Sequence, residues 1–184
     1  MKKQNGNIKK IVLGVTGSIA AYKAVEVMRD LQKKGYDIHV VMTCNAVEFV
    51  GELTFRTLSR NPVHVGLFDQ PEDWVPEHVS LADSADLILI APATANIIAK
   101  IATGLADDML SSIVLAAKCP VLIAPAMNVN MWTNPATVDN ILKLKKRGMR
   151  IIDVAEGTLS CGYEGQGRLA SVETITKEAV KALK

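Results

Sequence analysis

The 184-residue sequence has few aromatic residues, little net charge and no long apolar run. Aromatic residues make up 4% of it, and 21 Lys and Arg residues stand against 19 Asp and Glu residues, too small an excess to indicate a nucleic-acid-binding protein. No apolar run approaches the roughly 20 residues of a membrane span, and no apolar signal segment follows the polar residues 1–10. We therefore expect a cytoplasmic protein that acts on a small molecule.

Cysteine spacing also excludes two classes of protein. Cys44, Cys119 and Cys161 are odd in number and lack a C-x-x-C pair, which argues against a disulfide framework and against a zinc knuckle. Cys119 precedes Pro120 at the start of a predicted strand, so we interpret it as structural. The role of Cys44 stays open at this point.

The three histidines lack the matching carboxylate or cysteine spacing of a metal site, so no metal is predicted. His39 lies inside a predicted strand and His64 inside a Val-His-Val run, and both are interpreted as structural. His78 follows a proline-rich segment, residues 69–77, that is predicted to be a loop. A histidine at such an edge can act as a general base near neutral pH, although in isolation the pattern favours a partly exposed loop histidine.

Apolar runs alternate with helical patterns along the whole chain. Strands are predicted at residues 11–15, 38–42, 87–91, 121–124 and 151–154, and helices at residues 19–34, 46–59, 94–103, 108–118, 135–147 and 172–183. Because the strands are continuously apolar, they predict a parallel sheet covered on both faces. We expect one α/β domain over residues 1–184, a doubly wound, Rossmann-like or flavodoxin-like sheet, with residues 1–9 as a flexible tail and residues 156–168 as a mobile active-site loop.

Ligands of such sheets bind beyond the carboxyl ends of the strands. The segments that follow those ends are rich in hydroxyls, amides, proline and glycine, namely residues 16–18, 43–45, 92–96, 125–128 and 156–168. One site could therefore collect all five segments.

The first of these turns favours a phosphate. Gly14-Val-Thr-Gly17-Ser18 opens a helix and places free backbone N–H groups at its positive end. The spacing matches neither G-x-G-x-x-G nor the P-loop, and the second strand ends in Thr43 where a dinucleotide fold has an acidic residue for the ribose. Flavin mononucleotide, FMN, is consistent with this pattern. A tight turn with no ligand remains the alternative.

Two further segments carry side chains suited to chemistry. Residues 125–132 read PAMNVNMW, in which amides can anchor a carboxylate and Met and Trp can flank a flat ring. A helix cap at Asn134, before Pro135, is the structural alternative, but it leaves these eight residues unexplained. In the second segment, four glycines surround Cys161 between residues 156 and 168, which favours a reactive cysteine on a loop able to close.

Taken together, these motifs resemble those of the flavin-dependent cysteine decarboxylases, and among them the branch that acts on phosphopantothenoylcysteine in coenzyme A synthesis. The resemblance covers residues 11–168 and rests on GSIAAYK at 17–23, His78, PATAN at 92–96, GLADD at 104–108 and P-x-MN-x-x-MW at 125–132. One departure occurs at residues 160–163, which read SCGY where the family loop usually reads ACGD.

The resemblance implies a role for each matching residue. FMN would be bound by Gly17, Ser18, Ile19 and Thr43, with Thr94 and Asn96 close to it; the catalytic residues would be His78 as acid/base, Asn128 holding the substrate carboxylate beside Met127 and Ala126, and Cys161 as proton donor.

The implied reaction converts 4'-phosphopantothenoylcysteine into 4'-phosphopantetheine. A β-thiol carboxylate has no electron sink for the carbanion, so the thiol is first oxidised, CO2 is then lost, and the flavin returns the hydride. The resemblance also implies a homotrimer or homododecamer with the flavin site between subunits, and a phosphopantothenoylcysteine synthetase that is separate or fused.

Three other functions fit a similar scaffold. A peptidyl-cysteine decarboxylase of lantibiotic maturation stops at the enethiol, so Cys161 argues against it. A flavin prenyltransferase is disfavoured by His78 and by the MN-x-x-MW motif. A non-catalytic, flavin-binding regulatory subunit that inhibits a phosphatase tends to carry an acidic tail, and this sequence has none.

Overall fold

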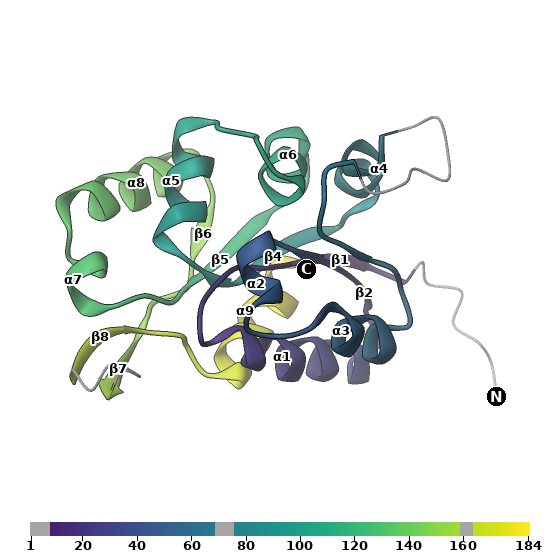
Figure 1. Cartoon of the computed structure of the whole chain (residues 1–184), viewed down its shortest axis with the longest axis horizontal. Coiled ribbons are helices and arrows are strands. Elements are labelled where there is room, and N and C mark those ends of the chain that lie inside the picture. Colours follow the sequence, from purple (N-terminus) through teal and green to yellow (C-terminus); the bar gives the residue numbers. More distant parts are fainter. Residues whose placement is uncertain (1–7, 69–75, 159–163) are drawn as a thin grey trace.

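The computed structural model describes residues 8–68, 76–158 and 164–184, which build a six-stranded sheet with helices on both faces (Figure 1). The order is β3-β2-β1-β4-β5-β6, and every neighbouring pair is parallel. The strands are β1 (Lys10–Val15), β2 (Asp37–Met42), β3 (Val63–His64), β4 (Leu87–Ala93), β5 (Val121–Pro125) and β6 (Arg150–Ile151). The predicted doubly wound α/β fold is confirmed. Its strand order reverses between β1 and β4, the point where such sheets bind ligands.

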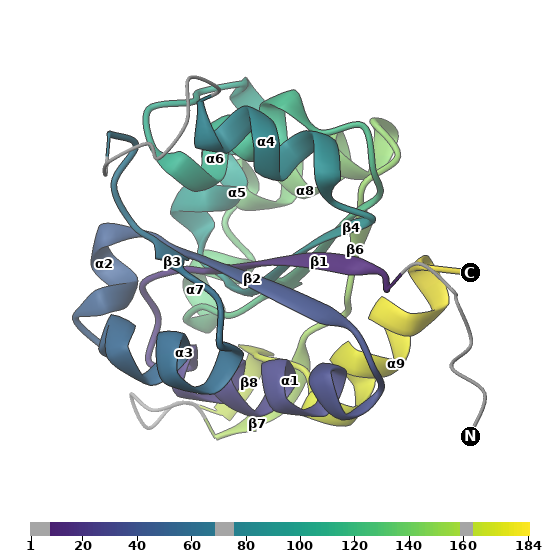
Figure 2. The ribbon, with the colours of Figure 1, turned by 90° about the vertical axis from the view of Figure 1, so that its right-hand side faces the viewer.

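Two helical layers enclose the sheet (Figure 2). One face is covered by α1 (Ala21–Lys33), α3 (Glu52–Ser59) and α9 (Val172–Ala182), and the other by α4 (Glu77–Ser84), α5 (Ala95–Thr103), α6 (Met109–Ala116) and α8 (Pro135–Lys146). The short helices α2 (Cys44–Val47) and α7 (Val129–Trp132) follow the carboxyl ends of β2 and β5. Alternate residues of β1 serve the two cores, since Ile11 and Leu13 pack in one and Val12 in the other.

In helix α1 the buried side chains follow the helical spacing of apolar residues in the sequence. The side chains that it buries completely recur at helical spacing, namely Ala21, Ala24, Val27, Met28 and Leu31. The helix ends where Gly35 adopts a φ of +89°, a left-handed conformation that glycine adopts without steric cost. In the described residues, no helix combines the length and apolar character needed to cross a bilayer.

Several predicted elements differ from the structure. Residues 46–59, predicted as one helix, lie in two separate helices, α2 and α3. Of the predicted strand 151–154, only Ile151 pairs with β5, together with Arg150. The predicted loop ends earlier than expected, because α4 begins at Glu77 and packs Leu81 and Ala82 into the core beside α6. His78 therefore lies on a helix rather than at a loop edge.

Most of the predicted loop 156–168 is instead an antiparallel hairpin of β7 (Ala155–Thr158) and β8 (Glu164–Arg168). The hairpin is held against the segment after β5, since the Met127 N–H donates to the Gly167 carbonyl oxygen at 2.9 Å. Tertiary contact thus supplies the order that a glycine-rich sequence does not predict. Cys161 and most of the predicted tail, residues 1–7, lie outside the described residues.

Candidate functional site

A cavity of about 470 Å³ opens at the carboxyl ends of β1 and β4, within the size range of small-molecule sites. It is lined by Thr16, Gly17, Thr43, Cys44, Asn45, Thr94, Asn96, Ile97, Lys100, Asp107, Asp108 and Met131. Four residues expected near a cofactor, Gly17, Thr43, Thr94 and Asn96, are therefore brought together from three separate turns.

Thr16 fixes the turns after β1 and β4 against each other. Its side chain is almost fully buried, and its hydroxyl donates to the Pro92 carbonyl oxygen at 2.7 Å. The oxygen of the Thr16 hydroxyl in turn accepts the Thr94 N–H at 3.0 Å. One hydroxyl therefore joins residues more than 70 positions apart in the sequence, and sequence reasoning had no pattern from which to predict this.

The turn at Gly17 passes very close to the start of α2. A Cβ at residue 17 would lie 2.5 Å from the Asn45 Cβ and 3.0 Å from its backbone carbonyl atoms. The cavity therefore has a wall made of backbone at this point, as close approach of a phosphate requires. Ser18 and Ile19 do not line the cavity: the Ser18 hydroxyl accepts the Ala20 N–H at 3.3 Å, and Ile19 is 56% exposed.

Helix α5 presents its amino-terminal end to the same cavity. Thr94 is its N-cap, and the hydroxyl accepts the Ile97 N–H at 3.4 Å. Asn96 and Lys100 are four residues apart on this nine-residue helix, so they share one face, which lines the cavity. Amide donors and a positive helix end are suited to an anionic group.

Lys100 also forms an ion-pair cluster on the cavity wall that sequence reasoning missed. Its Nζ lies 2.6 Å from both Asp107 Oδ1 and Asp108 Oδ2. The hydrogen bonds that Lys100 donates to these carboxylates raise its pKa above 10.5. Burial by itself would raise the pKa of Asp108, but hydrogen bonds from Lys100 and Ser111 outweigh it and lower that pKa below 3.8. The one sequence signal for Lys100 was its four-residue spacing from Asn96, which places both residues on the same face of a predicted helix.

His78 does not line this cavity. It is the second residue of α4 and is partly exposed. Its neighbour Glu77 accepts a hydrogen bond from His64 Nδ1, or pairs with its charged form, at 3.0 Å, and the His64 side chain is 8% exposed. His64 thus anchors the beginning of α4, while His39 contacts Asp37 within β2. Both contacts fit the structural interpretation of these two histidines.

The segment after β5 reaches the cavity through Met131 alone. Asn128 is the N-cap of α7, and its Oδ1 accepts the Asn130 N–H at 2.8 Å. Ala126 is buried, and its N–H donates to the Ala93 carbonyl oxygen at 2.9 Å. Neither Asn128 nor Ala126 nor Met127 is among the lining residues. The structure therefore gathers predicted cofactor residues in one cavity and leaves the predicted substrate residues beside it.

The helix cap expected at Asn134 is present. Its Oδ1 accepts the Ala136 N–H at 3.0 Å, with Pro135 in the first turn of α8.

The two described cysteines differ in their exposure to solvent. Cys44 is exposed and lines the cavity, whereas Cys119 is half-buried and burial raises the pKa of its thiol. Among residues 8–68, 76–158 and 164–184, no three His, Cys, Asp or Glu side chains are grouped as a metal site.

The model of the family called Flavoprotein matches residues 1–184. The chain belongs to this flavoprotein family. The family implies a flavin cofactor, and the cavity fits one, because a tight glycine turn, a helix N-terminus and a set of hydroxyls and amides meet there. Thr43, at the end of β2, also lines it.

Two curated relatives show strong similarity. The coenzyme A biosynthesis bifunctional protein CoaBC of Mycolicibacterium smegmatis is 48% identical over 91% of this chain and 40% of its own length. The chain thus spans about two fifths of the length of that relative. The probable phosphopantothenoylcysteine decarboxylase of Streptococcus mutans is 44% identical over 95% of this chain and 99% of its own.

Solved structures agree with the fold. A PPC decarboxylase mutant complexed with pantothenoylaminoethenethiol has a TM-score of 0.83 at 28% identity, covering 95% of this chain and 98% of that one. SpaF, an FMN-dependent cysteine decarboxylase, has a TM-score of 0.83 at 33% identity, covering 96% of this chain and 98% of its own.

Proposed function

We propose that this protein decarboxylates 4'-phosphopantothenoylcysteine to 4'-phosphopantetheine with bound FMN, as a carboxy-lyase of coenzyme A synthesis. The observation that carries the proposal is the cavity at the β1–β4 switch point, which gathers Gly17, Thr43, Thr94 and Asn96. The similarity to a probable phosphopantothenoylcysteine decarboxylase over nearly the whole of both chains supports this substrate. We further propose that residues 1–184 form one flavoprotein domain and that it works in the cytoplasm.

FMN is favoured over larger nucleotides by the shape and chemistry of the turns. The Gly17 turn and the α5 N-terminus provide one place for a phosphate. Thr43 stands where a dinucleotide fold has an acid. SpaF, a structural neighbour, is named FMN-dependent. When bound, FMN supplies two-electron chemistry, taking up and returning the hydride of the thiol-bearing carbon.

The chain's own residues then serve binding and proton transfer. We propose that His78 is the acid/base, that Asn128 donates its amide to the substrate carboxylate beside Met127 and Ala126, and that Cys161 donates the last proton. Ser18 and Ile19 are proposed to contact the cofactor from the rim of the turn. The hairpin β7–β8 supports these roles, because its contact with Met127 holds the chain on both sides of Cys161 close to Asn128.

Because His78 lies outside the cavity lining, we propose that the complete site needs a neighbouring copy, in a homotrimer or homododecamer. Exposed apolar side chains line the cavity or lie within two residues of its lining in the sequence, and they support this: Ile19 is 56%, Leu105 51% and Met131 47% exposed. Exposed apolar side chains that gather around a site are typical of surfaces covered by another subunit. A phosphopantothenoylcysteine synthetase, separate or fused, is the proposed supplier of substrate, since CoaBC is named a bifunctional protein.

Two measurements test the function. Cofactor released by acid should have the mass of FMN, and an adenine-containing nucleotide would contradict the proposal. The protein, incubated anaerobically with 4'-phosphopantothenoylcysteine, should yield a product that has lost CO2 alone. A product lacking CO2 and two hydrogens would instead favour a peptidyl-cysteine decarboxylase.

The Cys161→Ser variant separates proton donation from loop structure. A serine hydroxyl is a far weaker acid than a thiol, whose ordinary pKa is about 8.5, so this variant should release CO2 but accumulate the unsaturated enethiol. The saturated product, formed more slowly, would exclude Cys161 as the donor.

A further inference from the structure

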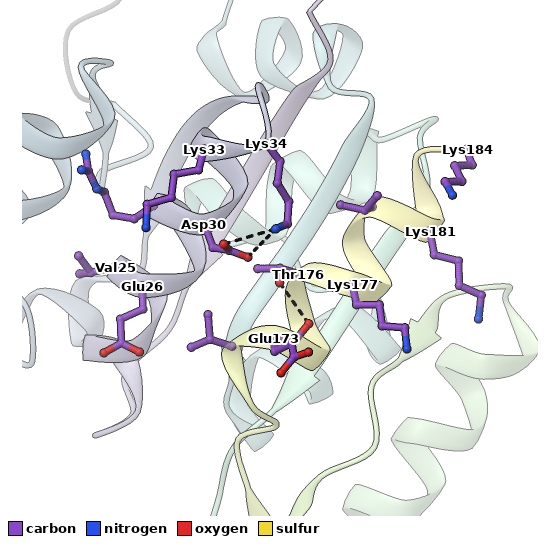
Figure 3. Close-up of a pocket in the computed structure, with 13 residues that line it drawn as sticks. Val25, Glu26, Asp30, Lys33, Lys34, Glu173, Thr176, Lys177, Lys181 and Lys184 are labelled. Atoms are coloured by element: carbon purple, nitrogen blue, oxygen red, sulfur yellow. Dashed lines mark hydrogen bonds and ion pairs between the residues drawn. The ribbon is translucent and has the colours of Figure 1, made fainter.

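A groove of about 1010 Å³ runs between α1 and α9 on the face of the sheet opposite α5, α6 and α8 (Figure 3). The two helices have 13 and 11 residues, which gives the groove a length of about 16 to 20 Å. It shares no lining residue with the cavity at the β1–β4 switch point.

The floor of the groove is apolar. Val172 and Val180 are half-buried and lie two turns apart on α9, with buried Thr176 between them. Val25, also half-buried, faces them from α1. Two packed helices with a half-buried apolar seam leave a place where a third helix can pack.

The rim of the groove is strongly basic. Six of the chain's 21 basic residues line it, against three of its 19 acidic residues, an excess of three positive charges. The rest of the chain carries one more acidic than basic residue, so the net positive charge of the protein comes from this groove.

Few of these charges are compensated within the chain. Lys34 pairs with Asp30 at 3.2 Å, and Lys181 pairs with Glu178, which lies outside the groove lining, at 3.6 Å. The other four basic residues form no ion pair with any described residue; they are Arg29, Lys33, Lys177 and Lys184.

Compensation of the helix dipole explains only part of this pattern. Basic residues in the last turn of a helix are stabilised by its negative end, and Lys33 and Lys181 occupy such positions. Arg29 and Lys177 lie more than one turn before the ends of α1 and α9, where that effect has faded. Helix-dipole compensation therefore does not account for the charge of these two residues.

The charges are also polarised along the groove. Figure 3 shows Glu26 and Glu173 near its lower end, where both helices begin, and Lys34 and Lys184 at its upper end, where both helices finish. An ordinary helix has acidic residues in its first turns and basic residues in its last turns. Such a helix matches the groove when it runs antiparallel to α1 and α9.

We infer that this groove docks an acidic amphipathic helix of a partner protein, antiparallel to α1 and α9, with its acidic first half over the lysines. A second copy of this face would place an excess of three positive charges against another excess of three, which opposes self-pairing. The apolar floor favours a helix over a small anion.

Two synthetic peptides of about 14 residues test the inference, since that length spans the groove. Both have leucines at every third or fourth position and the same composition, with more Glu than Lys. One carries Glu in its first half and Lys in its second, and the other has the reverse order. We expect the first to bind the full-length protein at least about tenfold more tightly at low salt, measured by fluorescence anisotropy.

Variants locate the binding. The double variant Lys33→Gln/Lys184→Gln should bind the first peptide at least about fivefold more weakly than the wild type. The control is the double variant Lys145→Gln/Lys146→Gln, whose lysines are exposed on α8 across the sheet. It should change the affinity less than about twofold. All these lysines are exposed, so the fold should be retained, as circular dichroism can verify.

Equal binding of both peptides, no binding of either, or equal weakening by both double variants would overturn the inference. So would displacement of the peptide by micromolar ATP, which would indicate a small-anion site, or self-association lost in the Lys33/Lys184 variant.

Discussion

The backbone N–H of Met127 donates to the carbonyl oxygen of Gly167 at 2.9 Å and joins the segment after β5 to strand β8. Gly167 has a φ of +128°, and a Cβ there would clash with the Met127 carbonyl oxygen. Two segments 40 residues apart in the sequence are thus fixed together by backbone atoms alone. Both flank residues proposed to act on the substrate.

Gly167→Ala should therefore reduce turnover at least about tenfold, because the hairpin must move away from Met127 and misplaces the groups around the substrate. Flavin affinity should stay within about twofold, since no described residue of β7 or β8 lines the cavity. Steady-state kinetics and a flavin fluorescence titration measure the two effects. Gly51→Ala is the control, as a Cβ there meets nothing within 4 Å. Unchanged turnover in Gly167→Ala would show that the contact has no catalytic consequence.

Gly17→Ala should lower flavin affinity, the quantity that Gly167→Ala is expected to leave unchanged. The new methyl group would lie 2.5 Å from the Asn45 Cβ, so the turn or α2 must shift and the backbone wall of the cavity opens. We expect flavin affinity to fall at least about tenfold, measured by titrating the apoprotein and following flavin fluorescence. Normal affinity, equal to that of Gly51→Ala, would remove this turn from the cofactor site.

His78→Asn should keep the flavin but lose thiol oxidation by about 10² to 10⁴ in rate, the usual contribution of a general base. Anaerobic stopped-flow mixing with substrate would follow the bleaching of the flavin absorbance. His39→Asn provides the comparison, because His39 contacts Asp37 within β2 and should leave the rate unchanged. Bleaching at the normal rate in His78→Asn would mean that another group removes the proton.

Lys100→Met should destabilise the protein by about 1 to 3 kcal/mol, since it leaves two carboxylates without the ammonium group that lies 2.6 Å from each. Urea unfolding followed by circular dichroism measures the change. Lys118→Met is matched to it, because Lys118 pairs with Asp83 at 3.3 Å on the exposed surface and should cost less than about 0.5 kcal/mol. Equal effects of the two variants would show that the Lys100 cluster contributes no more than a surface pair.

The lowered pKa of Asp108 predicts a specific acid sensitivity. A carboxyl group whose folded pKa lies below its unfolded value of 3.8 stabilises the fold above that pH, and this stabilisation is lost as the pH falls through the folded pKa. The free energy of unfolding of the wild type, measured with urea, should therefore fall steeply below pH 3.8. Asp108→Asn should flatten this acid limb, whereas Asp83→Asn, at an exposed pair, should leave it intact. A limb of unchanged slope in Asp108→Asn would assign the acid sensitivity to other carboxyl groups.

The sequence predicts elements best where burial is complete. The fully buried Ile11, Leu13 and Val15 make β1 recognisable, and the helical spacing of α1 is equally clear. Helix α4 was missed because it buries only Leu81 and Ala82, and two adjacent buried residues are too few to establish a helical period. β3 has two residues and β8 contains two glycines, so neither has the β-branched pattern of a strand. These elements form through tertiary contacts.

The same distinction applies to the site. Gly17, Thr94 and Asn96 follow strand ends, and the rule that such ends meet at one edge was enough to bring them together. Lys100 and Asp108 lie a turn or more beyond a strand end, so that rule does not reach them. The distance of His78 from the lining depends on how α4 packs on α6, which no local pattern encodes.

The Thr16 hydroxyl bridges the Pro92 carbonyl oxygen and the Thr94 N–H, so the cavity forms only when β1 and β4 are paired. A ligand there can bind only the folded sheet, so by mass action it stabilises the whole domain, by about 2.7 kcal/mol at a concentration 100 times its Kd. Cellular proteases cleave chains from the unfolded population. The supply of flavin should consequently set the lifetime of this protein as well as its activity.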